Sequence, residues 1–200
     1  MTKDDSYSSV AKALHWLIAA IIIVQIPAGI VMHNLPFSDT KFTMYQFHKS
    51  FGLIVLALSL FRLYWRLTHR APALETTVTG WQRVAARFSH TAFYVLIIAI
   101  PLTGWLMVSA STTGIPTKIF FLVPVPHLPV PAGEATEDLF KEAHELLAFA
   151  TLGLLALHVA AALKHHLKDR DQTLVRMLPR SLAARLSGAS RAAPGSKTES

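Results

Sequence analysis

Four long apolar segments limit what this chain can fold into more than any other feature. Each is close to the roughly 20 residues that an α-helix needs to cross the hydrocarbon core of a bilayer. They cover residues 13–34, 43–65, 88–110 and 140–163. Hydrophobic residues make up 52% of the sequence and charged residues only 16%, which is unusual for a soluble domain of this size. We therefore predict an all-α, up-down bundle of four transmembrane helices in contact with membrane lipid.

Basic residues mark one side of the predicted bundle. Five arginines lie within residues 62–87, around the link from the second segment to the third, and five lysines or arginines lie within residues 164–180. The positive-inside rule therefore places both termini and this link in the cytoplasm. The links near residues 35–42 and 111–139 then face outward. A signal peptide is an alternative for the first segment, but its apolar run exceeds the about 7–15 residues typical of such peptides.

One membrane domain accounts for residues 1–180. The outward link at residues 111–139 has prolines at positions 124, 126, 129 and 131, which exclude a regular helix there and indicate an apolar lid over the outer end of the bundle. Residues 181–200 are rich in Ser, Ala, Gly and Arg, a composition that is typical of a disordered polar tail. The sequence therefore predicts no second folded domain.

Histidines are the residues in this chain that most strongly indicate chemistry. The sequence contains ten of them and no cysteine, which excludes disulfides, cysteine-ligated iron-sulfur clusters and zinc-thiolate sites. An imidazole in hydrocarbon is costly without a partner. The predicted topology places His15 and His158 near the inner surface and His48 and His144 near the outer surface. His158 lies fourteen positions after His144, so in a helix the two residues are roughly 21 Å apart on nearly the same face.

Two opposed pairs of histidines suit the axial ligation of haem iron from both faces of the ring. Filling both axial positions leaves no open site for oxygen, so this arrangement favours electron transfer. Structural hydrogen bonding and zinc or copper binding are alternatives for the same residues. A haem-free bundle with such pairs along its axis would be a proton or metal-ion transporter. A third alternative is a membrane anchor for a larger redox enzyme.

Motifs in all four segments carry a family resemblance. They are "ALHWLIA" at 13–19, "FHKSFGL" at 47–53, "HTAFYVLIIAIPLTGW" at 90–105 and "HELLAFATLGLLALHVAAALKHHL" at 144–167. Together they resemble the bacterial cytochrome b561 family, including its superoxide oxidase members, over about residues 7–180. The resemblance implies two non-covalent b-type haems, one ligated by His15 and His158 and the other by His48 and His144. It also implies that Gly52, which lacks a side chain, lets a porphyrin approach the helix.

The resemblance further implies an oxidoreductase of the bacterial inner membrane that exchanges single electrons with ubiquinone. In superoxide oxidases the outer donor is superoxide, whereas other members pass electrons to a periplasmic or membrane protein. The outer segments mix lysines with acidic residues, so the outer face is not strongly basic and the donor stays open. No nucleic-acid partner is expected.

Basic side chains beside the proposed ligands are candidates for contacts to the haems and the quinone. We expect Arg62 and Arg66 to pair with inner haem propionates or with lipid phosphates, and Lys49 and Lys141 to pair with outer propionates. His165 lies seven residues after His158, on the same helix face. The resemblance of "AALKHH" to the segment near the quinone site of superoxide oxidases makes His165 the expected quinone contact.

Three further histidines are given lesser roles. We expect His90 to act as a hydrogen-bonding neighbour of the inner haem, because both irons already have their ligands. His33 competes with His48 for the outer site but lies where the first helix ends. His127, in the proline-rich link, is expected to be an exposed loop residue.

Overall fold

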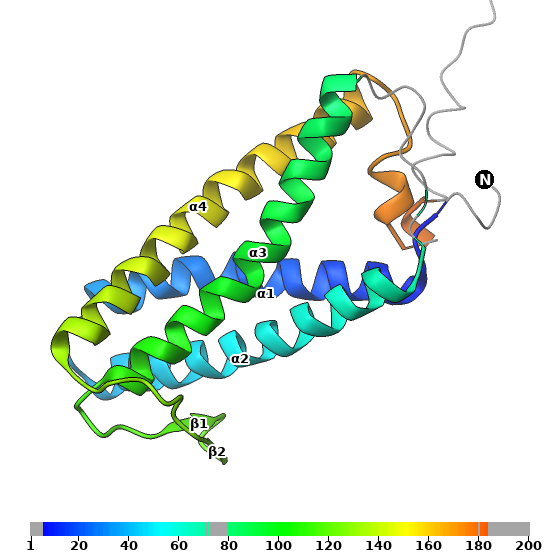
Figure 1. Ribbon diagram of the computed structural model, residues 1–200. Coiled ribbons are helices and arrows are strands. Elements are labelled where there is room, and N and C mark those ends of the chain that lie inside the picture. Colours follow the sequence, from blue (N-terminus) through cyan, green and yellow to red (C-terminus); the bar gives the residue numbers. More distant parts are fainter. Residues whose placement is uncertain (1–5, 71, 73–79, 180, 184–200) are drawn as a thin grey trace, which may run out of the picture.

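Four long helices form the bundle (Figure 1) in a computed structural model that describes residues 6–70, 72, 80–179 and 181–183. In chain order, the elements are α1 (Ser9–Asn34), α2 (Asp39–Thr68), α3 (Gly80–Ala110), β1 (Thr117–Ile119), β2 (Val123–Val125), α4 (Glu134–Leu167) and the short 3-10 helix η2 (Val175–Met177). All four long helices are apolar enough to cross a membrane. This confirms the prediction of an all-α membrane bundle.

The helices begin earlier than the apolar segments because polar residues cap them. The Ser8 hydroxyl accepts a hydrogen bond from the Ala11 amide at 3.2 Å, and the Ser38 hydroxyl accepts one from the Lys41 amide at 3.2 Å. Each cap satisfies an amide that the first helical turn leaves without a partner. Helices α1 and α2 therefore extend past the hydrocarbon-length runs that hydropathy alone identifies.

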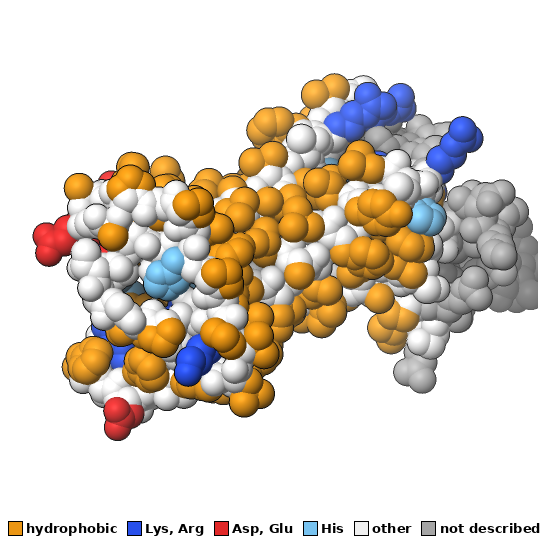
Figure 2. All heavy atoms as spheres, turned by 60° about the horizontal axis from the view of Figure 1, so that its bottom comes forward, with side chains coloured by type: hydrophobic (Ala, Val, Ile, Leu, Met, Phe, Trp, Pro, Cys, Tyr) orange, Lys and Arg blue, Asp and Glu red, His pale blue; other side chains and the backbone are white. Residues whose placement is uncertain are grey.

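Apolar side chains face outward and small polar side chains lie inside. Figure 2 shows hydrophobic side chains covering the middle of the molecule, with charged side chains gathered at its two ends. Val24 on α1 is 66% exposed and Leu157 on α4 is 70% exposed, as expected for residues that contact lipid. Ser50, Ser59 and Thr151 are instead buried, and such small residues let helices approach closely.

Packing between the helices is uneven. Helix α3 packs mainly against α4, α1 packs against α2, and α2 packs against α3. Among the described residues, α4 has almost no close backbone contacts with α1 or α2. The backbone of α4 therefore lies farther from α1 and α2 than from α3.

A short β-hairpin lies at one end of the bundle, which we call the outer end. The predicted lid contains this antiparallel pair, in which Lys118 lies opposite Pro124. Phe120 and Phe121 adopt positive φ angles of 47° and 64° and so form the turn. The Ser50 hydroxyl of α2 accepts a hydrogen bond from the Phe120 amide at 2.8 Å. The hairpin is thereby fixed to the bundle, a regular element that the proline-rich sequence did not predict.

The opposite end, which we call the inner end, holds both ends of the described chain (Figure 1). Here the segment after α4 returns to the start of α1. The Lys12 ammonium donates a hydrogen bond to the Leu178 carbonyl at 3.0 Å, and the Trp16 indole donates one to the Met177 carbonyl at 2.8 Å. The predicted disordered tail, residues 181–200, lies outside the described residues apart from 181–183.

Candidate functional site

Four histidines form two facing pairs, one near each end of the bundle. At the inner end, the ring centres of His15 on α1 and His158 on α4 are 6.4 Å apart. At the outer end, the ring centres of His48 on α2 and His144 on α4 are 6.1 Å apart. In each pair one histidine comes from α4 and the other from a helix that α4 barely contacts. Each pair therefore joins two helices whose backbones are not closely packed against each other.

The outer pair lies in a cavity of about 650 Å³, a volume in the range of small-molecule and cofactor sites. Lys49, Lys141 and Gly52 line this cavity together with both histidines. A Cβ atom at Gly52 would meet nothing within 4 Å, so the glycine leaves open space beside His48.

The His144 ring is held in position by α3. Its Nδ1 atom lies 2.9 Å from the Ile100 carbonyl oxygen, close enough for a hydrogen bond, and 3.4 Å from the Thr103 hydroxyl. A Cβ atom at Gly104 would lie 3.1 Å from the Cε1 atom of this ring. With Nδ1 occupied by a backbone carbonyl, Nε2 is the nitrogen available to a ligand, which is the usual arrangement for a metal-bound histidine.

The His48 ring is enclosed by α1. A Cβ atom at Gly29 would lie 3.4 Å from its Cε1 atom, and the Gln25 side chain donates a hydrogen bond to the His48 carbonyl at 2.8 Å. The Nδ1 atom of His48 is buried without a hydrogen-bond partner among the described residues. Buried polar atoms are rarely left unpaired, so we expect this ring to bind a ligand or to form a hydrogen bond with a group in the cavity.

The inner pair has a third histidine beside it. The ring centres of His90 on α3 and His158 are 6.1 Å apart, about as close as those of His15 and His158. Phe93 also contacts the His158 ring edge-on at 5.2 Å. However, α3 and α4 are the most closely packed helices of the bundle, whereas α1 and α4 have almost no close backbone contacts among the described residues.

Two arginines of α2 lie at the inner end, as the sequence predicts. The Arg62 guanidinium donates a hydrogen bond to the Ala11 carbonyl at 3.2 Å and lies 5.9 Å from the Tyr94 ring centre. Arg66 instead lines a groove of about 840 Å³ between α2 and α3, together with His90. Arg62 is therefore placed near the start of α1, and Arg66 lies beside His90 in the groove between α2 and α3.

The other histidines singled out by the sequence lie outside the two pairs. The Nδ1 atom of His165 lies near two aspartate side chains at the end of α4. The Nδ1 atom of His33 lies 3.8 Å from a carboxylate oxygen of Glu145 at the outer end. His127 is exposed, as expected for the link between α3 and α4.

Four groups that surround the outer histidine rings were not predicted from the sequence. These are Gln25, Gly29, the Ile100 carbonyl and Gly104. The one available signal was a glycine in each of two apolar segments, and a glycine in a membrane helix more often serves helix packing.

The geometry of both pairs fits a metal bound between two imidazoles. Two imidazoles that bind one metal through bonds of about 2.0 Å have ring centres roughly 6 Å apart. The observed distances of 6.4 and 6.1 Å agree with this value. The cavity at the outer pair is large enough for a flat group around the metal, and the donors at both pairs are imidazoles, which hold haem iron in many proteins.

Comparisons with known proteins agree with this geometry. A family model described as prokaryotic cytochrome b561 matches residues 6–180. Cytochrome b561 homolog 2 of Escherichia coli (strain K12) is 33% identical over 178 residues, which cover 88% of this chain and 93% of that protein. Cytochrome b561 homolog 1 of the same organism is 29% identical over 175 residues, covering 87% and 97%. A protein of Yersinia pestis named probable superoxide oxidase CybB is 28% identical over 177 residues, covering 87% and 96%. Members of the matched family bind b-type haem.

Proposed function

Because the chain belongs to the prokaryotic cytochrome b561 family, we propose that it holds two b-type haems and transfers single electrons across a membrane. The observation that supports this most directly is the two histidine pairs, each of which joins α4 to a helix that it does not pack closely against. Haem with two histidine ligands supplies a one-electron carrier that has no open coordination position for oxygen.

His15 and His158 are the proposed ligands at the inner end, and His48 and His144 are the proposed ligands at the outer end. His90 is as close to His158 as His15 is, but it comes from α3, which packs directly on α4 and leaves little room for a porphyrin between them. We therefore assign His90 the role of a neighbouring hydrogen-bonding group.

Basic side chains would neutralise the propionates of each haem. At the inner end, the Arg62 guanidinium donates a hydrogen bond to the Ala11 carbonyl, about one helical turn from His15, so it is the candidate to pair with a propionate there. At the outer end, Lys49 and Lys141 line the cavity. The guanidinium of Arg66 would pair with either a propionate or a lipid phosphate at the inner end.

The proposed reaction is the oxidation of superoxide at the outer end, coupled to the reduction of ubiquinone at the inner end. Two superoxide anions give two dioxygen molecules and two electrons, which with two protons convert ubiquinone to ubiquinol. The name of the Yersinia pestis relative supports this donor, and the resemblance around His165 supports a quinone contact there. The protein would lie in the bacterial inner membrane with both termini in the cytoplasm.

Haem content and superoxide-driven reduction test the proposal. Purified protein is expected to be coloured, to show b-type bands on reduction, and to contain two haems per chain. His158→Ala and His144→Ala should each remove one haem, and retention of both haems in either variant would reject the ligand assignment. Colourless folded protein would indicate a haem-free transporter instead.

The donor is tested separately on the haem-loaded protein. Mixing it with a superoxide source and ubiquinone should reduce the haems faster than the same mixture containing superoxide dismutase. Equal rates would reject superoxide as the donor and favour a protein partner on the outer side, while leaving the two-haem assignment intact.

A further inference from the structure

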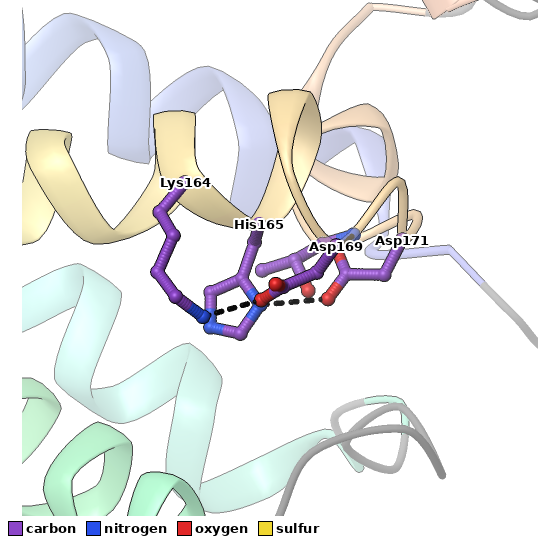
Figure 3. A network of polar contacts seen from close by, with 5 residues as sticks. Lys164, His165, Asp169 and Asp171 are labelled. Atoms are coloured by element: carbon purple, nitrogen blue, oxygen red, sulfur yellow. Dashed lines mark hydrogen bonds and ion pairs between the residues drawn. The ribbon is translucent and has the colours of Figure 1, made fainter.

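A cluster of charged side chains lies where α4 ends, away from both histidine pairs. Figure 3 shows Lys164, His165, Asp169 and Asp171 pointing toward one another. The His165 Nδ1 atom lies 2.8 Å from Asp171 Oδ2 and 3.1 Å from Asp169 Oδ2. The Lys164 ammonium donates a hydrogen bond to the same Asp169 oxygen at 2.6 Å. One imidazole nitrogen therefore faces two carboxylate oxygens.

Hydrogen bonding alone does not satisfy this cluster. A ring nitrogen carries at most one N–H group, which points in a single direction and cannot serve two oxygens well. Neither His165 Nδ1 nor Asp171 Oδ2 makes a hydrogen bond of acceptable geometry, although both atoms are buried. The Asp171 side chain is only 3% exposed. The nearest donor group to this buried carboxylate oxygen is the His165 ring nitrogen at 2.8 Å, which Asp169 shares, so a cation between the three groups would stabilise the carboxylate.

The backbone holds the three groups in place without the help of a cation. Arg170, between the two aspartates, adopts a positive φ of 52°, which turns the chain back toward α4. The Asp171 amide donates a hydrogen bond to the His165 carbonyl at 3.1 Å. The other Asp171 oxygen, Oδ1, accepts a hydrogen bond from the Thr173 amide at 2.9 Å. Only Oδ2 is left to face the cluster.

We propose that His165 Nδ1, Asp169 Oδ2 and Asp171 Oδ2 bind a divalent transition-metal ion of the zinc class. All three atoms lie within 4.8 Å of one another. A metal with bonds of about 2.0–2.2 Å to nitrogen and oxygen needs ligand atoms roughly 3–3.5 Å apart, so only a small adjustment is required. One imidazole and two carboxylates suit zinc, and water would complete the coordination. The site uses Nδ1 of His165 and does not rest on the proposed quinone contact.

Lys164 competes with the metal for Asp169. Its hydrogen bond to Asp169 holds the pKa of that carboxyl below the ordinary value, because the ammonium stabilises the charged form. The ammonium occupies part of the space that the metal would take, and a bound dication has to displace it. Removing the lysine side chain should therefore strengthen metal binding, whereas removing the aspartate should weaken it.

Zinc binding to the haem-loaded, detergent-purified protein tests the site. After chelator treatment, equilibrium dialysis against Zn²⁺ followed by elemental analysis should give one zinc ion per chain. Asp169→Asn should weaken binding at least tenfold, and Lys164→Gln should strengthen it several-fold. His166→Ala and Lys168→Gln are matched controls, since each changes a neighbouring residue that is not a proposed ligand. Both controls should bind zinc like the wild type.

Three results would overturn the proposal. They are the absence of stoichiometric zinc in the wild-type protein, equal affinity of the wild type and Asp169→Asn, and equal strengthening by Lys164→Gln and Lys168→Gln. Asp171→Asn is a second ligand variant and should also lose zinc. Because Asp171 also accepts a backbone hydrogen bond, this variant is compared only if its haem content and absorption spectrum match those of the wild type.

Discussion

Single glycines control the space around the proposed outer haem ligands. A Cβ atom at Gly104 would lie 3.1 Å from Cε1 and 3.2 Å from Nδ1 of His144, closer than most side-chain contacts in proteins. The His144 ring cannot easily retreat, because its Nδ1 atom is hydrogen-bonded to the Ile100 carbonyl. We expect Gly104→Ala to weaken binding of the outer haem about tenfold or more, since overpacking costs about 1–3 kcal/mol. Haem content per chain measures this effect.

Gly153→Ala is the control for this substitution. Gly153 lies on α4, where an added Cβ atom would meet nothing within 4 Å. The variant should keep both haems, since an alanine in a helix is at least as favourable as a glycine. If Gly104→Ala and Gly153→Ala retained haem equally well, Gly104 would have no special role beside His144.

At the scale of elements, two tryptophans fix segments that the helices alone would leave loose. The Trp16 indole of α1 holds the segment after α4 through the Met177 carbonyl, and the Trp105 indole of α3 holds the outer link through the Pro126 carbonyl at 3.1 Å. Trp16→Phe should remove one hydrogen bond worth about 1 kcal/mol. Local opening at the inner end should then become about fivefold more frequent.

Limited trypsin digestion measures this opening through cleavage after Arg176, which is buried in the intact protein. Trp16→Phe should accelerate this cleavage. The matched variant Trp105→Phe should not, because its hydrogen bond lies at the outer end. Equal cleavage rates in Trp16→Phe and the wild type would mean that the indole does not hold this segment.

At the scale of the whole molecule, basic side chains predict which end faces the cytoplasm. On the face shown in Figure 2, the outer end carries both acidic and basic side chains, while the charged side chains seen at the inner end are Lys or Arg. The sequence contains no cysteine, so single introduced thiols report orientation. Thr112→Cys, in the exposed outer link, should react with a membrane-impermeant maleimide in intact cells. Gln172→Cys, in the exposed segment after α4, should react only after the cells are opened.

The opposite labelling pattern would contradict the cytoplasmic location of both termini. Labelling of both variants in intact cells would indicate that the reagent enters the cells. A cytoplasmic protein with a reactive cysteine is the control for such entry, because it should stay unlabelled in the same sample.

The sequence by itself determined the four spans and the depth of each histidine along the membrane normal. Hydropathy and the rise of a helix are local properties, so they can be obtained without knowing any contact between helices. The resulting prediction of an all-α membrane bundle is confirmed, and the rings of the predicted partners, His15 with His158 and His48 with His144, lie next to each other in an edge-on arrangement.

Only the tertiary structure decided what surrounds these rings. The rotation of each helix about its axis and the angles at which the helices cross bring Gly29 against His48 and Gly104 against His144. They also bring His90 against His158. The spacing of residues within one segment does not determine these rotations and crossing angles. The same holds at the end of α4, where the left-handed Arg170 turns Asp171 back onto His165. The proximity of side chains on different elements depends on how the whole bundle packs. The position of a histidine along its helix, and so its expected depth in the membrane, depends on the local sequence alone.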